Sequence, residues 1–530
     1  MLPPVLEEEA RIGDQPEAAR PVVSPRRPWT RLDLVALVAI TLIAAIVRLW
    51  GLADPPDLVF DETYYAKDAC HYVGGSEELC GIADESTKVH PPLGKWIIAV
   101  GVKVFGFDSF GWRVGPAIAG IITVALLFLL ARRLFKSLMP AVVASLLLAF
   151  DPLHFVQSRT SMLDVFVPMF ALAAFLFLLI DRDRMVERST LPPEEEEGVA
   201  FRRPWRIAAG AAAGAAVASK WSGILILVAV LVLTIIWELA WRKRAGLRDY
   251  VRRAVTREGL SVLLYLMLVP LLVYTSTFIG RIHDPIPNYV DGGNCAYKAG
   301  NWPYNFYQQQ WCMLGFHRTL EANHSYQSPG WSWPLIKRPV SYFFCSGDDC
   351  EPDIDDGTYQ EIFATGSPFV WWSSLVAMAI LAIAWVRKRD FRQPEGFILA
   401  GFAFTYLPWL IPSGRDAVFI FYLLPTLAFM CLAIAWAFTK LGETWEAKAS
   451  VALFMAGAIG LFVFYYPLLT KGSISEPSWR KRIWIFDSCE KPEGVATQTT
   501  LTTTKNGREV VETKDTMKND DLPPKGWCWI

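Results

Sequence analysis

Long apolar segments alternate with short polar ones along most of the chain, which predicts a protein that crosses a membrane many times. A run of about 18 or more apolar residues can span a hydrocarbon core of about 30 Å as a helix. The apolar segment 96–107 is too short to cross, so we expect it to lie at the interface. The eleven predicted spans, of which the third and fifth are short, are 32–53, 112–131, 138–152, 164–180, 206–219, 222–240, 258–280, 368–386, 396–412, 416–438 and 449–467.

The first 29 residues are polar and rich in Pro and Arg, which predicts a disordered tail over 1–29. No small-residue cleavage pattern follows the first apolar run, so we interpret it as a span and not as a cleavable signal. Only 19% of the 530 residues are charged, below the roughly one quarter of ordinary soluble proteins. A formal net charge of −1 gives no electrostatic case for binding nucleic acid.

Two independent patterns predict the same orientation in the membrane. Lys and Arg gather in alternate connections, which favours a cytoplasmic N-terminus and, after an odd number of spans, an exterior C-terminus. The same topology places eight of the nine cysteines outside, where an oxidising environment permits disulfides, and only Cys431 within a span. From proximity alone we expect the pairs Cys70–Cys80, Cys295–Cys312, Cys345–Cys350 and Cys489–Cys528.

Three exterior pieces follow from this topology. The first loop, 54–111, contains the adjacent acidic residues of the motif FDE. The loop 281–367 is rich in Trp, Tyr, Asn, Gly and Pro, and the tail 471–530 contains an expected strand pair that turns at Asn506-Gly507.

Ionisable residues gather at the predicted outer face. Each alone has an ordinary interpretation, because an Arg at the end of a span commonly anchors it and adjacent Asp-Glu is common in loops. Their joint occurrence is unusual, since Lys and Arg favour the inner side, and it indicates an anionic partner such as a lipid-linked phosphate. These residues are Arg48, Asp61, Glu62, His90, Lys95, Arg113, Asp151, His154, Arg159, Asp164, Lys220, Arg415 and Asp416.

Motifs of soluble enzymes are absent from the sequence. It has no Walker A loop, no dinucleotide-binding fingerprint, no HExxH and no CxxC pair, and six histidines leave little with which to build a metal site.

The outer-face motifs resemble those of the protein O-mannosyltransferases, in their actinobacterial form. The resemblance covers residues 30–470, in family order, and two departures are visible. The loop 281–367 is too short for the β-trefoil insertion of fungal and animal members, and Lys88 stands where eukaryotic members have an Asp before His-Pro-Pro. The motifs that carry the resemblance are FDE (60–62), HPPLGK (90–95), Trp-Arg (112–113), SRTSMLD (158–164), SKWSG (219–223) and the stretch from Arg415 to Pro425.

The resemblance implies a GT-C glycosyltransferase fold, with 30–470 as the catalytic membrane domain of an all-α polytopic protein. It implies inverting transfer of mannose from polyprenyl-phosphate-mannose to Ser or Thr of exported polypeptides, at the outer face of the plasma membrane. Other expected partners are membrane lipids and the Sec translocon, with no nucleic acid. No cofactor is required, because arginines can neutralise the phosphate, and a divalent metal stays open as an alternative.

The same resemblance suggests roles for individual residues. Asp61 is the expected general base for the acceptor hydroxyl, and Glu62 is expected to position the acceptor or the sugar. Cations can stabilise the departing lipid phosphate. The expected phosphate-binding residues are Arg48, Arg113 and Arg415, with Arg159 and Lys220 behind them. The residues expected to shape the site are His90, Pro91, Pro92, Lys95, Asp164, Trp221 and Tyr422.

Three rival interpretations remain at this point. A related GT-C enzyme would glycosylate a lipid or a cell-wall glycan instead of protein. A secondary transporter would place its charges at mid-membrane on broken helices. A non-catalytic scaffold would use the Trp-rich loop to hold partners.

Overall fold

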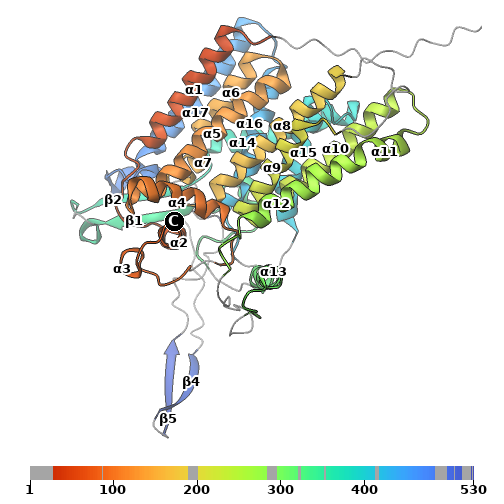
Figure 1. Ribbon diagram of the computed structural model, residues 1–530. Coiled ribbons are helices and arrows are strands. Elements are labelled where there is room, and N and C mark those ends of the chain that lie inside the picture. The colour runs from red at the N-terminus through yellow and green to blue at the C-terminus, as the bar shows by residue number, and fades with distance from the viewer. Residues whose placement is uncertain are drawn as a thin grey trace, which may run out of the picture.

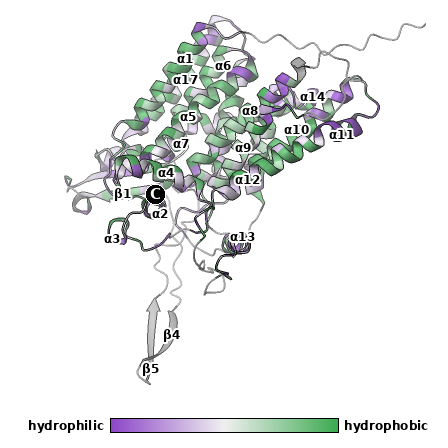
Figure 2. Ribbon diagram, in the orientation of Figure 1, coloured by the Kyte–Doolittle hydropathy of each residue, from purple (hydrophilic) through white to green (hydrophobic). Residues whose placement is uncertain are grey.

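The computed structural model describes residues 28–85, 88–188, 201–282, 295–319, 324–350, 354–411, 417–483, 498–505, 508–515, 527 and 529. Helices dominate these residues and run side by side as a bundle (Figure 1). Figure 2 shows hydrophobic residues along the middle of the bundle and hydrophilic residues toward its ends and connections. This distribution is the one that a bilayer requires of a spanning helical protein.

The predicted spans can be compared with the helices one by one. Eight helical segments of the described chain are long and apolar enough to cross a membrane. They are α1 (Arg31–Leu49), α5 (Ser109–Phe135), η1 with α8 (Leu163–Met185), η2 with α10 (Trp221–Arg244), α11 through α12 (Tyr250–Ser276), α14 (Pro368–Lys388), η7 with α16 (Ile420–Phe438) and α17 (Trp445–Leu469). The other three predicted spans are shorter helices, α6 (Leu138–Ala149), α9 (Pro204–Ser219) and α15 (Pro394–Tyr406). Eight long spans are therefore confirmed, and the count of eleven is not.

Local sequence signals explain where several of these helices begin. Thr30 and Asp33 form a capping box at the start of α1, in which each side chain accepts a hydrogen bond from the other residue's backbone N–H. Proline stands in the first turn of α9, α14, α15 and α16, where its missing N–H costs nothing.

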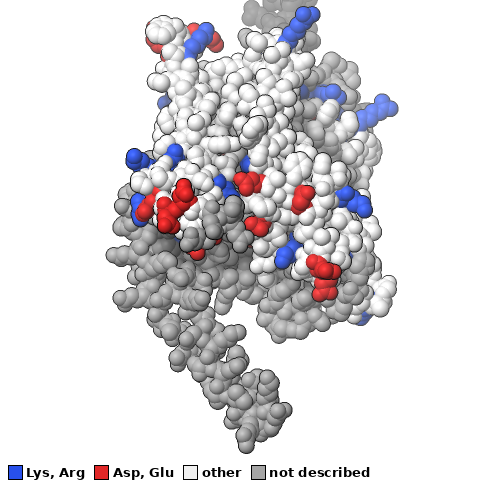
Figure 3. All heavy atoms as spheres, turned by 90° about the vertical axis from the view of Figure 1, so that its left-hand side faces the viewer, with Lys and Arg blue, Asp and Glu red and all other residues white. Residues whose placement is uncertain are grey.

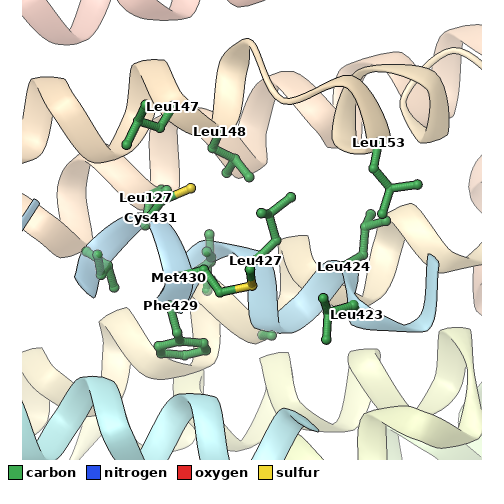
Figure 4. Close-up of a cluster of buried hydrophobic side chains, with 14 of the residues drawn as sticks. Leu127, Leu147, Leu148, Leu153, Leu423, Leu424, Leu427, Phe429, Met430 and Cys431 are labelled. Carbon is green, nitrogen blue, oxygen red and sulfur yellow. The ribbon is translucent and has the colours of Figure 1, made fainter. Parts of the chain in front are cut away.

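Helix α16 (Leu424–Phe438) forms the centre of the bundle. In the close-up of Figure 4, its apolar side chains, among them Leu427 and Met430, lie between those of the surrounding helices. The predicted burial of Cys431 within a span is confirmed, since this cysteine is free and fully buried there.

A buried ionic cluster joins the ends of four helices, α8, α9, α10 and α11. The Arg206 guanidinium lies 2.6 Å from the Glu238 carboxylate and 2.7 Å from the Glu258 carboxylate. Buried charges are tolerated only when they are paired in this way. The cluster consists of Asp181, Arg203, Arg206, Glu238, Arg242 and Glu258.

The small elements of the loop 54–111, which was predicted to be exterior, lie at the opposite end of the bundle from the chain's first described residues (Figure 1). They are α2 (Glu62–Tyr72), α3 (Glu77–Cys80) and α4 (Leu93–Phe105), the last containing the segment that was predicted to be too short to cross. Figure 3 shows Asp, Glu, Lys and Arg side chains gathered across the lower part of one face of the molecule.

Disulfides join residues within the segments that were predicted to be exterior. Three of the four expected pairs are confirmed, namely Cys70–Cys80, Cys295–Cys312 and Cys345–Cys350. The fourth expected pair, Cys489–Cys528, lies outside the described residues.

The prediction of an all-α protein missed one element, a three-stranded antiparallel sheet in the order β1-β2-β3. Its strands are β1 (Val340–Ser346), β2 (Thr358–Ala364) and the short β3 (Ile474–Ser475), which comes from the C-terminal tail. The expected strand pair of the tail is confirmed as β4 (Gln498–Lys505) and β5 (Arg508–Asp515), paired from Lys505↔Arg508 outward. The remaining helices are α7 (Pro152–Gln157), α13 (Trp302–Thr319) and α18 (Glu476–Arg480).

Glu361 of β2 gives this sheet a pH-dependent stability. Burial raises the pKa of Glu361 to about 7, although hydrogen bonds from Trp479 and Ser341 favour its charged form. Between pH 4.5 and about 7 the Glu361 carboxyl therefore keeps its proton in the folded protein, whereas it loses it in the unfolded chain. The free energy of unfolding falls as the pH rises through this range. We expect Glu361→Gln to raise the unfolding temperature at pH 8 but not at pH 5, with a difference of up to about 3 kcal/mol.

Thermal unfolding of both proteins in detergent at the two pH values measures this effect. Glu78→Gln, which changes an exposed carboxylate of α3, is the control and should leave the pH dependence unchanged. If Glu361→Gln and the wild type have equal unfolding temperatures at both pH values, the expectation is wrong.

Candidate active site

Asp61 lies at the start of α2, just beyond the loop that follows α1. It is the N-cap residue, but its side chain makes no capping hydrogen bond, and it is half-buried. The residue before it, Phe60, has a φ of 48°, a left-handed conformation that is uncommon for a bulky side chain. The carboxylate therefore leaves the chain at an unusual local turn and is not used to begin the helix.

Glu62 has a different environment from its neighbour. It is 0% exposed, and its carboxylate accepts two hydrogen bonds of 2.8 Å from the Nε and Nη2 of Arg113. It also accepts from the backbone N–H groups of Val59 at 3.0 Å and Ser161 at 2.8 Å. Glu62 thus ties α2 to α5 and to the turn before α8, and its expected role in positioning the acceptor or the sugar stays a prediction.

Arg113, the partner of Glu62, also binds the loop that leads to Asp61. Its Nη1 donates to the carbonyl of Pro55 at 2.6 Å, and its Nη2 donates to the carbonyl of Asp57 at 2.9 Å. With only 1% of the residue exposed, these contacts fix the path of the chain from α1 to α2.

Arg48 and Arg159 are held in a similar way around the end of α1. Arg48 is fully buried and contacts the Oγ of Ser158 at 3.2 Å and the Nδ1 of His154 at 2.9 Å. Arg159 donates to the carbonyls of Arg48, Trp50 and Gly51 at 2.8, 2.6 and 2.7 Å. Carbonyls at the C-terminus of a helix lack intrahelical donors, and a guanidinium satisfies several of them at once.

Three predicted phosphate ligands have protein partners in the structure. Arg48, Arg113 and Arg159 donate to protein atoms and hold neighbouring segments together, and their expected role in binding the donor phosphate stays a prediction. The fourth, Arg415, lies outside the described residues.

Lys220, the fifth predicted phosphate ligand, lies between α9 and α10. Its Nζ donates to both carboxylate oxygens of Asp164, at 2.7 and 2.8 Å, and stands 4.4 Å from the ring centre of Tyr422. The structure therefore brings together three residues that were predicted from separate motifs. The next residue, Trp221, donates from its Nε1 to the hydroxyl of Tyr274 at 2.8 Å.

Two buried phenols connect this group to Asp61. Burial raises the pKa of Tyr65 and Tyr342 well above the usual value, and the negative charges of Asp61 and Asp164 raise it further in both cases. The geometry agrees, since the ring centre of Phe421 lies 5.9 Å from the Nζ of Lys220 and 6.2 Å from the ring centre of Phe60, so Asp61 and the Asp164–Lys220 pair lie in one region of the molecule.

The HPPLGK motif lies behind α2. Pro91 and Pro92 are buried, and Pro92 is the N-cap of α4. Lys95, also fully buried, donates to Glu85 at 2.6 Å and lies 3.0 Å from Asp68, so it fixes α4 against α2. This motif shapes the site by holding its elements together.

His90 of the same motif links the first loop to α13. Its ring centre lies 5.8 Å from that of Tyr65 and 5.3 Å from that of His317, and the Nε2 of His317 lies 2.9 Å from the carbonyl of Val89. His317 was not among the predicted site residues, because nothing in the loop 281–367 indicated which of its segments returns to the first loop.

A cavity of about 760 Å³ with almost wholly apolar walls begins beside Trp221. Glycines on α9 allow the segment around Tyr265, which forms one wall of the cavity, to pack close against α9, since a Cβ at Gly210 would collide with the carbonyl of Tyr265. Its lining residues are Val217, Trp221, Ile224, Leu227, Leu263, Leu264, Met267, Leu268, Pro270, Leu271, Tyr274 and Gln310.

A metal centre is not indicated by the described part of the chain, which contains no group of three or more His, Cys, Asp or Glu that could hold an ion. The expectation that no cofactor is required stays a prediction.

Comparisons with known proteins identify the family. The model described as dolichyl-phosphate-mannose-protein mannosyltransferase matches residues 38–112 and 107–283, and the model of the C-terminal four-helix membrane region of protein O-mannosyltransferase matches residues 303–488. The polyprenol-phosphate-mannose–protein mannosyltransferase of Mycolicibacterium smegmatis is 30% identical over 527 residues, 89% of this chain and 98% of that protein. The enzyme of the same name from Mycobacterium tuberculosis is 28% identical, over 87% of this chain and 91% of that protein.

A solved structure shows the fold. The Saccharomyces cerevisiae protein O-mannosyltransferase Pmt1-Pmt2 complex bound to the sugar donor matches with a TM-score of 0.69 at 15% identity, over 87% of this chain and 93% of that chain. This likeness confirms the expected GT-C glycosyltransferase architecture and the multi-pass membrane class. The chain belongs to the protein O-mannosyltransferase family.

Proposed function

We propose that this protein transfers mannose from polyprenyl-phosphate-mannose to Ser and Thr hydroxyls of exported polypeptides, with inversion at the anomeric carbon. The observation that carries the proposal is the position of Asp61. Its half-buried carboxylate lies in one site with the Lys220–Asp164 pair, and that pair adjoins the apolar cavity beside Trp221.

The donor lipid fits the apolar cavity because an isoprenoid chain needs a wall without polar groups. Its phosphate would then lie near Lys220, the residue before Trp221. An ammonium group has three donors, so Lys220 can contact a phosphate while it keeps its ion pair with Asp164. Arg415 remains a second candidate for this phosphate.

The acceptor hydroxyl is a poor nucleophile until it loses its proton. Asp61 is the proposed general base, because its carboxylate is half-exposed and is not used to cap α2. As the hydroxyl oxygen attacks the anomeric carbon, its proton passes to Asp61 and the bond to the phosphate oxygen breaks. The phosphate leaves as an anion near Lys220, which can stabilise the growing charge.

The membrane orientation supports this assignment. The disulfides Cys70–Cys80 and Cys345–Cys350 lie in the pieces that carry Asp61 and the exterior sheet, and disulfides persist on the oxidising side of a membrane. We therefore place the site at the outer face of the plasma membrane, with the N-terminus in the cytoplasm. Acceptors would arrive as polypeptides from the Sec translocon.

The test is mannose transfer by the purified protein in lipid nanodiscs, with radiolabelled polyprenyl-phosphate-mannose as donor. A peptide rich in Ala, Pro and Thr should gain hexose, as measured by mass spectrometry, and the same peptide with Val for every Thr should not. Label that enters a glycolipid or a cell-wall glycan but not the peptide would overturn the proposal in favour of a different GT-C acceptor.

A further inference from the structure

Phe60, the residue before Asp61, occupies a strained backbone conformation. Its φ of 48° lies in the left-handed region, which costs a side chain without special local hydrogen bonding about 1–2 kcal/mol. Such a conformation persists only when the surrounding structure holds it. The direction in which the Asp61 carboxylate leaves the chain depends on this turn.

Aromatic rings from two distant segments surround the Phe60 ring. Tyr342 stacks on it with ring centres 4.5 Å apart and an angle of 13° between the planes. Phe419 and Phe421 contact it edge-on at 6.4 and 6.2 Å. Offset stacking and edge contacts are the favourable arrangements of aromatic pairs, and Tyr342 makes the closest of these contacts.

A β-bulge places Tyr342 in this position. In β1, Ser341 pairs with Phe363 and Phe343 pairs with Ile362, the next partner along, so Tyr342 is the extra residue without a partner in β2. Bulges of this kind redirect a side chain and often lie beside active sites. The hydroxyl of Tyr342 is hydrogen-bonded to the amide of Gln157 at the end of α7, which fixes the ring from the bundle side.

We propose that Tyr342 is a positioning residue for the transfer reaction, because its ring holds Phe60 in the left-handed turn that directs the Asp61 carboxylate to the acceptor hydroxyl. This role rests on the proposed function of Asp61 as general base. It makes the loop that carries β1 a part of the active site through its contact with Phe60.

The surroundings of Tyr342 agree with such a role. The residue is only 5% exposed, so its ring forms a buried wall against Phe60, the residue before Asp61. A catalytic group that is displaced by about 1 Å can lose about 100-fold in rate, so a ring that fixes its backbone can have a large effect without touching the substrate.

The test is the steady-state kinetics of Tyr342→Leu and Tyr342→Phe with the Thr-containing peptide and polyprenyl-phosphate-mannose. We expect Tyr342→Leu to lower kcat by about 10- to 100-fold and to leave the KM of donor and peptide within threefold, because binding groups are untouched. Tyr342→Phe keeps the ring and should retain at least about a third of kcat. A kcat of Tyr342→Leu within twofold of wild type would overturn the proposal.

Tyr359→Leu is the matched control. Tyr359 lies in β2 of the same sheet and stacks on Trp479 at 5.1 Å and 16°, so its loss perturbs the sheet in the same way but does not reach Phe60. Its kcat should stay near the wild-type value. An equal loss of kcat in Tyr359→Leu would overturn the proposal, since the effect would then come from the sheet in general.

Phe60→Gly provides the second measurement, because glycine adopts the same φ without strain but has no ring to be held. We expect it to lower kcat like Tyr342→Leu, and the double variant to be no slower than either single variant. A double variant whose loss of kcat equals the product of the two single losses would overturn the proposal. If Tyr342→Leu fails to fold, a wild-type kcat of Phe60→Gly would overturn it instead. No mannose transfer by the wild-type protein would instead refute the proposed function.

Discussion

Asp61→Asn is expected to lower the rate of mannose transfer by about 10²- to 10⁴-fold or more, the usual effect of losing a general base. An amide cannot accept the proton that the acceptor hydroxyl releases. The protein should still insert and fold, because the Asp61 side chain is half-exposed and does not cap α2. Single-turnover transfer from bound donor to peptide, together with thermal unfolding in detergent, measures the two properties separately.

Asp57→Asn is the control for this result. Asp57 is an exposed aspartate of the same loop, and only its backbone carbonyl takes part in the contacts with Arg113. It should transfer mannose at the wild-type rate. Near-normal transfer by Asp61→Asn would remove Asp61 from the mechanism, whatever the control shows.

Glu62→Ala is expected to have the opposite phenotype, a loss of folding stability of about 3–5 kcal/mol. The substitution leaves the Arg113 guanidinium buried without its counter-charge, and it also removes an acceptor for the backbone N–H groups of Val59 and Ser161. The yield of folded protein and its unfolding temperature should both fall. Together, these two expected results would give the neighbouring carboxylates separable tasks, one in chemistry and one in structure.

A double-mutant cycle with Arg113 tests the origin of this loss. Glu62→Leu with Arg113→Leu removes both charges, so the double variant should be less destabilised than the sum of the single variants. An unfolding temperature of Glu62→Ala equal to that of the wild type would show that the pair contributes nothing to stability.

The membrane part of the fold was predictable because a bilayer leaves few options for the backbone. Long apolar runs had to be helices, and the long helices are found where the runs are. The three-stranded sheet was not predictable, because β3 reaches β2 across more than a hundred residues of sequence that include three long spanning helices. The strand residues of β1 also lie in a loop whose composition is typical of irregular structure.

The candidate site was predictable in its charges but not in their partners. Asp164 and Lys220 form an ion pair, and Asp61 lies in the same region through Phe60 and Phe421, whereas the roles of these residues stay predictions. The buried arginines were expected to need an anion, and the structure supplies carbonyl oxygens or a carboxylate of the protein instead. A sequence shows where a guanidinium lies along the chain, but it does not show which backbone carbonyls are left unpaired at the end of a helix, as they are around Arg159.

The clamp that Arg159 forms on the last carbonyls of α1 has a consequence for what can be glycosylated. With α1 fixed at one end of the connection and Glu62 anchored at the other, the Asp61 carboxylate, the proposed base, cannot move far to meet a target. In the proposed mechanism the hydroxyl must therefore come to Asp61. An extended, newly exported segment of polypeptide can make that approach. A serine on a folded domain cannot, because the rest of the domain prevents it sterically. We therefore expect modification to precede the folding of the acceptor protein.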